Sequence, residues 1–457
     1  MSKQGVFHFE MSERKLLLRL FDILILILVI YSLNHVLDKT YIYQSEHFWV
    51  WVTVYCIYFL TFGTIFELYV LKQAESRFKV FKNLLLTIII TTTLYLFTPY
   101  ITPILPPNRL LIFQLIMSNV ILLTLWRFSY ITFINAPRFY KKVLFVGENY
   151  DIDKIFKELQ HFDPNYKIVG YNDNGGDQIK SKLIKSFEIN KITEIVHEEN
   201  IGEIVVADSF RGVNEGIYKY LAPLLKKGIP IKPYSKVYEG ITNRILLRDV
   251  TNDFYYYFPF SRSNKNKLYL ALNRLIDFVV SILGICAMLM LIYLINTIYN
   301  RGKLFYHQER IGKSSKPFKI IKFRTMVENA EDEGAKWAAK HDLRVTPFGR
   351  FLRRTRLDEI PQFINILKND MSLIGPRPER PVFIEKLKEK IPFYETRHII
   401  KPGLTGWAQV NAKYASSDDE TFEKLQYDLY YIKKRSLFID FRIIVKTIST
   451  IIFFRGH

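Results

Sequence analysis

The hydrophobic positions of this chain are gathered into long uncharged runs in its first third. Four runs are long enough for membrane-spanning helices, since about 20 apolar residues cross a bilayer. They cover roughly Leu16 to Leu37, Phe48 to Leu71, Leu84 to Ile104 and Leu110 to Ile134. The first run is too long for a cleavable signal peptide and no small-residue cleavage site follows it, so we expect it to be retained. The pattern predicts a four-helix transmembrane domain over residues 1–137.

The charged residues between these runs predict the orientation of that domain. Lys and Arg dominate before the first run, between the second and third, and after the fourth, whereas the first connection carries Asp38, Lys39 and Glu46. Cytoplasmic loops are enriched in Lys and Arg. We therefore expect the downstream part of the chain to begin in the cytoplasm.

Between residues 138 and 250 the pattern changes to short β-branched runs separated by polar helical stretches. The runs are Val143 to Val146, Lys167 to Tyr171, Ile204 to Ala207 and Ile229 to Lys232. This alternation predicts a small βαβ sheet, a Rossmann-like α/β module on the cytoplasmic side. Its first strand leads into Gly147-Glu148-Asn149, which lacks the small residues that let a pyrophosphate approach the backbone. We interpret the module as a degenerate nucleotide-binding fold with a packing or regulatory role.

A fifth apolar run, Phe278 to Asn300, contains 23 uncharged residues and is long enough to cross a bilayer. Basic residues flank it on both sides, among them Arg274 before it and Arg301 after it. A simple crossing would place one basic cluster outside, against the positive-inside bias. The charges favour a re-entrant helix at about 268–300, with a break near its middle, where Gly284 is the only helix breaker.

Composition narrows the classes of protein that remain. The chain has 457 residues, more than one compact core needs, and a net charge of +20, which predicts anionic partners. Its basic residues flank apolar segments, so lipid headgroups are favoured over nucleic acid. The two cysteines, Cys56 and Cys286, lie in apolar runs, which argues against a disulfide framework or a Cys-based zinc site. Oxygen and nitrogen groups in residues 251–457, predicted as a mainly α-helical domain, must supply the chemistry.

Two adjacent carboxylates, Asp358 and Glu359, follow an arginine-rich stretch and precede Pro361. Apolar residues at helical spacing begin at Ile360, and proline belongs in a first turn, so a helix is predicted to start near Asp358. The helix dipole and the arginines favour the ionised carboxylates, which makes Asp358 a candidate nucleophile or metal ligand. An ordinary acidic helix cap with solvated arginines is the alternative.

Two further segments place cations beside rigid backbone. Alternation puts Lys322 and Arg324 on one face of a strand, where they could clamp a diphosphate, although a solvated strand face fits equally well. Pro376 and Pro378 fix the backbone on either side of Arg377 and so present its guanidinium at little entropic cost. A surface arginine on a rigid loop is the alternative there.

Four motifs, in this order, resemble those of the bacterial polyprenyl-phosphate hexose-1-phosphate transferases. They are Lys322-Phe323-Arg324-Thr325-Met326, Leu357-Asp358-Glu359-Ile360-Pro361-Gln362, Gly375-Pro376-Arg377-Pro378 and Lys401-Pro402-Gly403-Leu404-Thr405-Gly406-Trp407-Ala408-Gln409-Val410-Asn411. The resemblance runs from about Lys265 to the C-terminus, and the upstream spans and α/β module are similar to those of the family's long members. It implies a multi-pass protein of the bacterial inner membrane whose active site faces the cytoplasm.

The resemblance also implies a reaction. A UDP-sugar would give its hexose-1-phosphate to polyprenyl (undecaprenyl) phosphate and release UMP, which initiates synthesis of an exopolysaccharide, capsule or other surface polysaccharide. Glucose and galactose are the sugars expected by default. The partners would be the UDP-sugar, polyprenyl phosphate and membrane lipids, with a homodimer as a candidate assembly and no nucleic acid.

The resemblance assigns roles to individual residues. Asp358 would be the nucleophile that forms a phosphosugar–enzyme intermediate, which predicts ping-pong kinetics, and Glu359 would hold Mg²⁺ beside it. Lys322 and Arg353 match positions near the phosphates, and Arg377 matches one near the uridine moiety. The residues expected to bind substrate are Arg324, Pro376, Arg377, Pro378, Lys413 and Asp440. Attack on a diphosphate needs several positive groups around phosphorus, which this set supplies.

The sequence departs from the family pattern at two places. Met288-Leu289-Met290 stands where the family has Ser-Pro in its re-entrant helix, and Ala412-Lys413 stands where it often has Gly-Arg. Lysine keeps the charge but loses the bidentate fork of arginine. The closing segment Phe438 to Phe454, with Arg442 and Lys446 on one face, is typical of an interfacial helix.

Two other functions compete with the transferase. A membrane-anchored nucleotide-sugar dehydratase or epimerase would need a glycine fingerprint after Val146 and a Tyr and a Lys four residues apart in the same module, and the sequence has neither in a convincing place. A non-catalytic scaffold for polysaccharide assembly would keep the motifs as structure only. Intact Asp358, Glu359 and Arg377 count against the scaffold.

Overall fold

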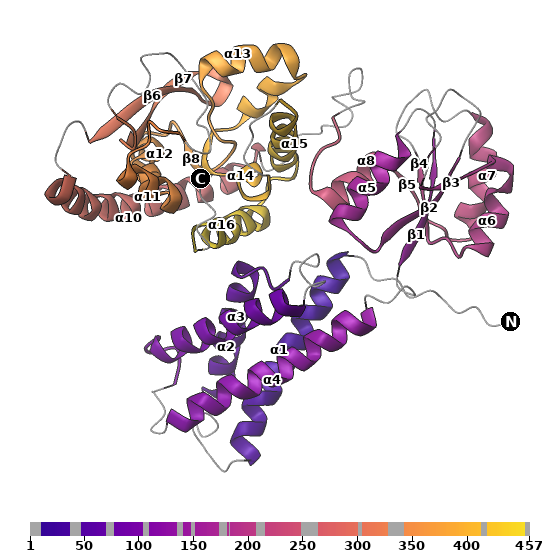
Figure 1. Cartoon of the computed structure of the whole chain (residues 1–457), viewed down its shortest axis with the longest axis horizontal. Helices are drawn as coiled ribbons and strands as arrows, with labels where there is room; N and C mark the ends of the chain where they lie inside the picture. Colours follow the sequence, from indigo (N-terminus) through magenta and orange to yellow (C-terminus); the bar gives the residue numbers. More distant parts are fainter. Residues whose placement is uncertain are drawn as a thin grey trace. The chain divides into compact units, whose positions relative to one another are not determined.

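The computed structural model describes residues 11–36, 47–69, 77–103, 109–134, 140–147, 151–172, 181, 183–206, 215–247, 264–299, 304–327, 342–412 and 418–452. The chain divides into two compact units, Met1–Thr242 and Asn243–His457 (Figure 1). Ile245 and Leu247 already belong to the core of the second unit. The domain limits at 137 and 250 stay predictions.

The apolar runs of the first unit form four helices. They are α1 (Met11–Val36), α2 (Phe48–Ile65), α3 (Arg77–Phe97) and α4 (Arg109–Ile134). Within the described residues, these four and α10 (Lys267–Tyr299) have the length and composition to cross a membrane. Buried side chains from all four helices of the first unit pack together, among them Leu26, Phe59, Ile88 and Leu123. The prediction of several apolar helices of bilayer length is confirmed.

A buried ion pair joins the first and last of these four helices. Asp22 on α1 is fully buried and pairs with Arg127 on α4. The same carboxylate accepts a hydrogen bond of 3.0 Å from the Tyr69 hydroxyl, and the Arg127 guanidinium lies 5.1 Å from the Tyr69 ring centre. Polar groups in a bundle of this kind must be satisfied by one another, because lipid offers no hydrogen bonds.

The rest of the first unit is a five-stranded parallel sheet with the order β3-β2-β1-β4-β5. Its strands are β1 (Lys141–Val146), β2 (Tyr166–Asn172), β3 (Lys185–Phe187), β4 (Glu203–Val206) and β5 (Ile231–Pro233). Its helical elements are α5 (Ile152–Phe162), η3 (Ile189–Lys191), α6 (Ile192–Glu198), α7 (Glu215–Lys226) and α8 (Tyr234–Thr242). Helices α6 and α7 cover one face and α5 and α8 the other (Figure 1). The predicted parallel sheet is confirmed, and only the short β3 was missed.

The second unit combines helices with two small sheets. After α10 come the antiparallel strands β6 (Phe305–Ile311) and β7 (Pro317–Phe323), joined through η5 (Lys313–Ser315), and the parallel pair β8 (Ser372–Ile374) and β9 (Gly403–Thr405). The helical elements are α11 (Pro347–Thr355), η6 (Leu357–Glu359), α12 (Gln362–Leu367), α13 (Pro381–Lys390), η7 (Tyr394–Ile399), α14 (Trp407–Asn411), α15 (Asp418–Lys434) and α16 (Leu437–Ile452). α12 lies between α10 and the β6–β7 hairpin (Figure 1).

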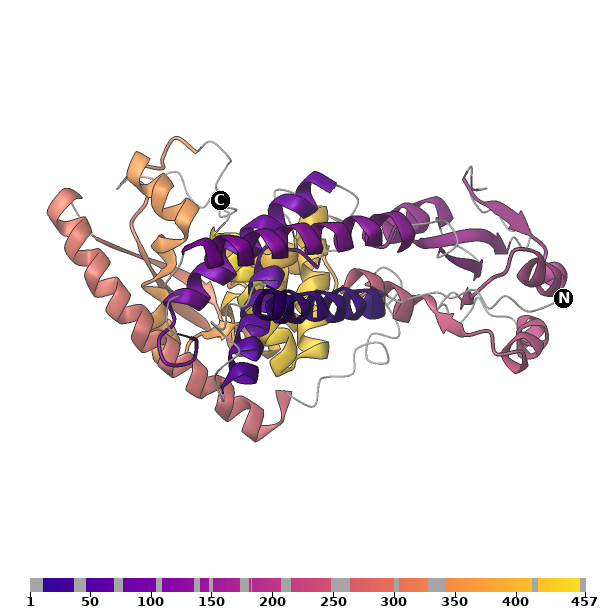
Figure 2. The same cartoon turned by 90° about the horizontal axis from the view of Figure 1, so that it is seen from below.

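Helix α10 is unbroken along its 33 residues (Figure 2), so the predicted break near its middle is not present. Gly284 instead allows close packing, because a Cβ there would lie 2.2 Å from the Phe363 ring on α12. Arg274 donates to the carbonyl oxygens of Ile366 and Leu367 at 2.7 and 2.9 Å, and the Leu373 amide donates to Asp277 Oδ1 at 2.8 Å. These contacts fix α12 and β8 to one face of α10.

The C-terminal helix α16 packs its basic residues inward rather than presenting them to solvent. Arg442 and Lys446 lie over the Trp407 ring, at 5.0 and 5.3 Å from its centre. α16 also exposes large apolar side chains, among them Phe441 and Phe438, whose ring centre lies 5.9 Å from the Arg442 guanidinium. Exposed apolar side chains beside half-buried cations agree with an interfacial helix, with its cations used for packing.

Candidate active site

The β6–β7 hairpin supplies one wall of the site. Lys322 on β7 lies opposite Tyr306 on β6, so both side chains leave the same face of the hairpin. The Lys322 Nζ lies 3.5 Å from Oε1 of Glu359. Burial lowers the pKa of Lys322, and the Glu359 charge opposes that shift. The predicted strand therefore presents Lys322 to the carboxylate pair.

Helix α11 leads the chain to the two carboxylates. Thr346 caps its first turn by accepting a hydrogen bond of 2.9 Å from the Gly349 amide, and Pro347 stands where no amide is needed. A Cβ on Gly349 would lie 2.0 Å from the Thr325 carbonyl oxygen, so only glycine fits. Arg353 Nε donates to Thr325 Oγ1 at 2.9 Å. α11 is thereby fixed to the segment that follows β7.

The turn after α11 sets the direction of Asp358 and Glu359. Arg356 has a left-handed backbone conformation, with φ of 57°, that ends α11. The next three residues form the short turn η6, and α12 begins only at Gln362. A helical turn thus starts near Asp358 as predicted, but it is a short 3-10 turn, and the α-helix itself begins later. The left-handed residue forces a new turn, and both carboxylates lie in that turn rather than in the first turn of α12.

Glu359 is held by three cations. Its Oε1 lies 2.6 Å from the Arg377 guanidinium and 3.5 Å from Lys322, and its Oε2 lies 3.8 Å from Arg356. The side chain is only 7% exposed, and burial alone would raise its pKa. The three cations outweigh burial and hold the pKa of Glu359 well below its usual value. Glu359 is therefore an ionised, fixed carboxylate.

Asp358 has a different environment. It is 8% exposed, and no residue in the described ranges is hydrogen-bonded to its carboxylate. Burial and the neighbouring Glu359 charge raise the pKa of Asp358 to about 6, against the opposing charges of Lys322, Arg353 and Arg377. We expected the helix dipole and the arginines to favour its ionised form, and the direction of the shift is the opposite. The carboxylate is still mostly ionised at pH 7, and it is poorly solvated.

The loop around Arg377 joins two of the motifs through close backbone contact. The Gly375 amide donates to the Thr405 carbonyl and the Gly403 amide to the Pro376 carbonyl, both at 2.9 Å. A Cβ on Gly403 would lie 2.0 Å from the Gly375 nitrogen, so these two backbone segments can approach each other this closely only at glycine. The motif that ends in Asn411 therefore supports the loop that carries Arg377.

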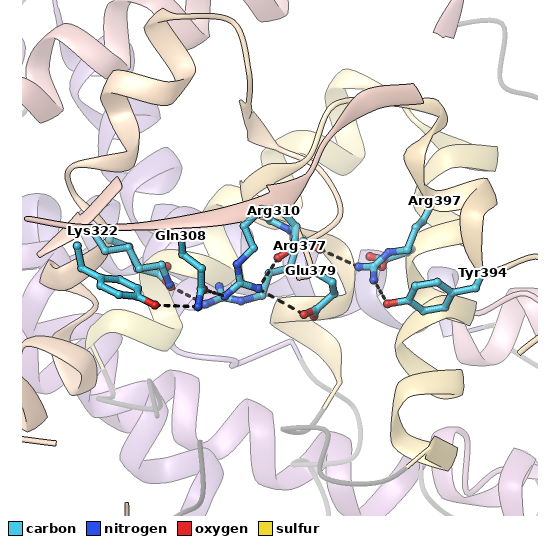
Figure 3. A network of polar contacts seen from close by, with 11 residues as sticks. Gln308, Arg310, Lys322, Arg377, Glu379, Tyr394 and Arg397 are labelled. Atoms are coloured by element: carbon cyan, nitrogen blue, oxygen red, sulfur yellow. Dashed lines mark hydrogen bonds and ion pairs between the residues drawn. The ribbon is translucent and has the colours of Figure 1, made fainter. Parts of the chain in front are cut away.

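A chain of polar contacts continues from this loop across the unit (Figure 3). Gln308 Nε2 donates to the Tyr306 hydroxyl at 3.0 Å, and Arg310 donates to Gln308 Oε1 at 2.5 Å and to the Pro378 carbonyl at 3.0 Å. The two buried prolines on either side of Arg377 thus accept hydrogen bonds at their carbonyl oxygens, Pro376 from Gly403 and Pro378 from Arg310.

The structure brings most of the predicted residues together. Lys322, Arg353 and Arg377 act on the Asp358–Glu359 pair. Arg324 directly follows β7, with its amide 2.9 Å from the Leu304 carbonyl. Asp440 accepts hydrogen bonds from Tyr269 at 2.5 Å and Tyr431 at 2.7 Å, so its carboxylate ties α16 to α10 and α15. Lys413 lies outside the described residues.

Two arginines of this region were not singled out from the sequence. Arg356 belongs to the arginine-rich stretch before Asp358, and its position three residues before Glu359 could have indicated the contact. Arg310 alternates with Gln308 and Tyr306 along β6, a pattern that can be read only once the hairpin register is known.

The donor set suits a hard divalent cation only in part. Among the residues that the structure describes, no three His, Cys, Asp or Glu side chains are grouped to hold a metal. Mg²⁺ commonly takes one or two carboxylates and completes its shell with water and substrate phosphates. Asp358 and Glu359 provide such a pair, and the cation contact at Oε2 of Glu359, at 3.8 Å, is longer than those at Oε1, at 2.6 and 3.5 Å. The pair therefore fits Mg²⁺ together with a phosphate ligand.

The second unit matches the sequence model of bacterial sugar transferases over residues 268–454. The chain is 37% identical over 237 residues to a UDP-N-acetylgalactosamine-undecaprenyl-phosphate N-acetylgalactosaminephosphotransferase of Aeromonas hydrophila, covering 51% of this chain and 55% of that protein. It is 48% identical over 141 residues to a putative undecaprenyl-phosphate N-acetylgalactosaminyl 1-phosphate transferase of Bacillus subtilis, covering 30% of this chain and 79% of that protein. It is 43% identical to a UDP-glucose:undecaprenyl-phosphate glucose-1-phosphate transferase of Escherichia coli, covering 32% of each.

The structure brings the four motifs together around one carboxylate pair. The chain belongs to the bacterial sugar transferase family. The matched region spans about half the length of the Aeromonas relative and about a third of the Escherichia relative.

Proposed function

We propose that this protein transfers a sugar-1-phosphate from a UDP-sugar to polyprenyl phosphate and releases UMP, as the first step of a surface polysaccharide. The observation that carries the proposal is Asp358, a buried carboxylate beside four cationic side chains and one fixed carboxylate. The family relatives, named as undecaprenyl-phosphate sugar phosphotransferases, support the same reaction class.

The chemistry proceeds in two displacements. An Asp358 carboxylate oxygen attacks the phosphorus that bears the sugar, the bond to the UMP oxygen breaks, and UMP leaves with that electron pair. A phosphate oxygen of the polyprenyl phosphate then attacks the phosphosugar-Asp358, and the bond to the carboxylate breaks. The products are a polyprenyl diphosphate sugar and the regenerated Asp358, so one small site serves a soluble donor and a lipid acceptor in turn.

The surrounding charges suit this reaction. Lys322, Arg353, Arg356 and Arg377 lie around the two carboxylates, and such a concentration of cations suits an anionic diphosphate. Glu359 and Asp358 would hold Mg²⁺, which reduces repulsion between the nucleophile and the phosphates when bound. Glu359 stays ionised because its pKa is low, so it can keep this role across the working pH range.

The membrane arrangement is part of the proposal. Helices α1 to α4 would cross the bacterial inner membrane, and the active site would face the cytoplasm. The basic flanks of α10 favour entry and exit on the cytoplasmic side, which requires this helix to bend in the bilayer, because it has no break in the structure. The exposed apolar side chains of α10 and α16, among them Leu283 and Phe441, are suited to lipid, while Arg274 and Asp277 are bonded to α12 and the start of β8. A homodimer in this membrane remains part of the proposal, with lipids, UDP-sugar and polyprenyl phosphate as partners and no nucleic acid.

The decisive test measures UMP release by the purified full-length protein with polyprenyl phosphate and Mg²⁺. The donor panel contains UDP-glucose, UDP-galactose and UDP-N-acetylgalactosamine. We expect lipid-dependent release from one donor, ping-pong kinetics and loss of activity on chelation of Mg²⁺. A ternary-complex pattern would contradict the covalent step, and no release from any donor would favour a scaffold.

A further inference from the structure

A second buried ion pair lies behind the loop that carries Arg377. Arg397 in η7 is 7% exposed, and its NH2 lies 2.7 Å from Oδ2 of Asp428 on α15, which is 1% exposed. The other guanidinium nitrogen donates to the Tyr394 hydroxyl at 2.5 Å, and the guanidinium lies 5.1 Å from that ring's centre. Both terminal nitrogens of this guanidinium therefore contact residues of the second unit.

The same guanidinium also contacts the active-site loop. Arg397 NH2 donates to the backbone carbonyl of Arg377 at 2.9 Å (Figure 3). The Arg377 side chain in turn lies 2.6 Å from Oε1 of Glu359. A continuous series of short contacts therefore runs from Asp428 on α15 through Arg397 and Arg377 to the carboxylate pair.

Packing alone gives little reason for such a pair. Two buried charges lose their hydration, and well-packed apolar residues of similar volume are often as stable. Burial raises the pKa of Asp428 to about 6, which shows that its charge is costly here. Lysine could balance Asp428 but could not also donate to Tyr394 and to the Arg377 carbonyl with a planar fork. The hydrogen bond to the Arg377 backbone therefore explains why arginine, rather than lysine, occupies position 397.

We propose that Arg397, held by Asp428 and Tyr394, is a positioning residue that fixes the Arg377 guanidinium for the diphosphate of the donor. The inference rests on the proposed function and deepens it, because it assigns donor affinity to a residue outside the family motifs quoted above. Arg397 acts only through Arg377 and touches neither substrate.

The chain offers a matched control in Arg244. This arginine is 6% exposed, lies 3.3 Å from Glu423 on the same helix α15, and stacks 5.4 Å from the Tyr427 ring centre. It shares the chemistry of Arg397, namely a buried guanidinium, a carboxylate on α15 and a tyrosine ring. Glu423 and Tyr427 lie on α15 rather than on the Arg377 loop, so Arg244→Lys measures the structural part of the effect.

The experiment compares Arg397→Lys and Arg244→Lys in the purified full-length protein with Mg²⁺. Binding of UDP is measured by calorimetry, and the KM for donor and for polyprenyl phosphate by UMP release. We expect Arg397→Lys to raise the UDP Kd and the donor KM about ten-fold, the usual effect of one charge-assisted hydrogen bond, with an unchanged KM for the lipid. Arg244→Lys should leave all three constants unchanged, even if both variants lower the melting temperature.

A second arm repeats both substitutions in an Arg377→Ala background. A residue that acts through Arg377 loses its effect there, so Arg397→Lys should change the UDP Kd less than two-fold. Persistence of the full effect, or a wild-type UDP Kd in Arg397→Lys alone, overturns the inference. Wild-type protein that neither binds UDP nor releases UMP overturns the proposed function and this inference with it, whereas an active wild type beside an unaffected Arg397→Lys overturns the inference only.

Discussion

Two buried carboxylates, Glu203 in the first unit and Asp358 in the second, have pKa values shifted in opposite directions. In the sheet of the first unit, Glu203 at the start of β4 is 1% exposed and has three partners at short range: Lys141 and Lys232 at 2.7 Å and the Tyr166 hydroxyl at 3.0 Å. These partners outweigh burial and lower the pKa of Glu203. In the second unit, Asp358 is buried almost as well, yet its pKa is raised to about 6.

Both carboxylates have cations nearby, but their other neighbours differ. Glu203 has short contacts with two lysines and a tyrosine at the end of a sheet, whereas Asp358 lies beside the charged Glu359, and no described residue is hydrogen-bonded to its carboxylate. Three partners on Glu203 leave little room for a substrate, since a carboxylate accepts about four hydrogen bonds. A buried carboxylate that keeps its lone pairs free is costly, which is typical of a reacting group.

The largest expected effect comes from removing the negative charge of Asp358 or of Glu203. Asp358→Asn removes the nucleophile, so UMP release should fall by roughly 10³-fold or more, with an unchanged melting temperature. Glu203→Gln removes the charge that Lys141 and Lys232 contact and should lower the free energy of unfolding by about 3 kcal/mol, while the activity per folded molecule is retained. Thermal melts and UMP assays on both variants check this, and an active Asp358→Asn enzyme would refute the assignment.

Much of the fold and of the candidate site could be predicted from the sequence. The apolar runs, the parallel sheet and the closeness of Lys322, Arg353 and Arg377 to the carboxylate pair follow from period, charge and motif order. The direction of the Asp358 pKa shift did not, because local rules include the helix dipole but not burial or the charge of Glu359. The start of α12 was misplaced for a related reason, since nothing in the composition around Arg356 indicates a left-handed residue.

The part of the site that could not be predicted depends on contacts distant in sequence. Arg397 and Asp428 belong to two helical elements whose approach is fixed only by the packed core of the second unit. Arg310 reaches the Pro378 carbonyl because β6 pairs with β7 in one particular register. Neither contact has a local signature, whereas the contact between Gly375 and Gly403 could have been suspected from two glycines in neighbouring motifs.

The second prediction tests whether the cations at Asp358 serve the substrate rather than stability. Arg377→Lys keeps the charge beside Glu359 but loses the planar fork, so kcat/KM for the donor should fall by about 100-fold. Arg354→Lys on the exposed side of α11 is the control and should leave kcat/KM within two-fold. Equal losses in both variants would mean that the fork of Arg377 has no special role.

The third prediction concerns pH. Asp358 must be ionised to attack, and its pKa is raised to about 6, so activity should be constant above that pH and be lost as pH falls through it. At pH 5 the donor kcat/KM should be about ten-fold below its plateau. Glu359 stays ionised over this range because its pKa is far lower.

A pH profile of donor kcat/KM from 4.5 to 8, with melting temperatures recorded at each pH, separates titration from unfolding. An acid limb near pH 4 would mean that Asp358 has the pKa of an ordinary solvated carboxylate. Activity that persists unchanged at pH 5 would contradict the raised pKa.

The smallest expected effect concerns the packing of α12 on α10, which holds the turn with Asp358 in place. Glu203 is fixed by a sheet ladder, whereas the turn with Asp358 is continuous with α12, which rests on α10 at the contact of Gly284 with Phe363. Gly284→Ala places a Cβ where the ring now lies, and should lower the free energy of unfolding by about 1–3 kcal/mol, with a few-fold loss of activity. Gly240→Ala in α8 is the control, since no atom lies within 4 Å of its Cβ, and it should stabilise slightly.

Because the clash involves one ring, Phe363→Leu in the Gly284→Ala background should restore part of both losses, as measured by melts and UMP release. Additive losses in the double variant would show that α12 depends on some other contact with α10 for its position.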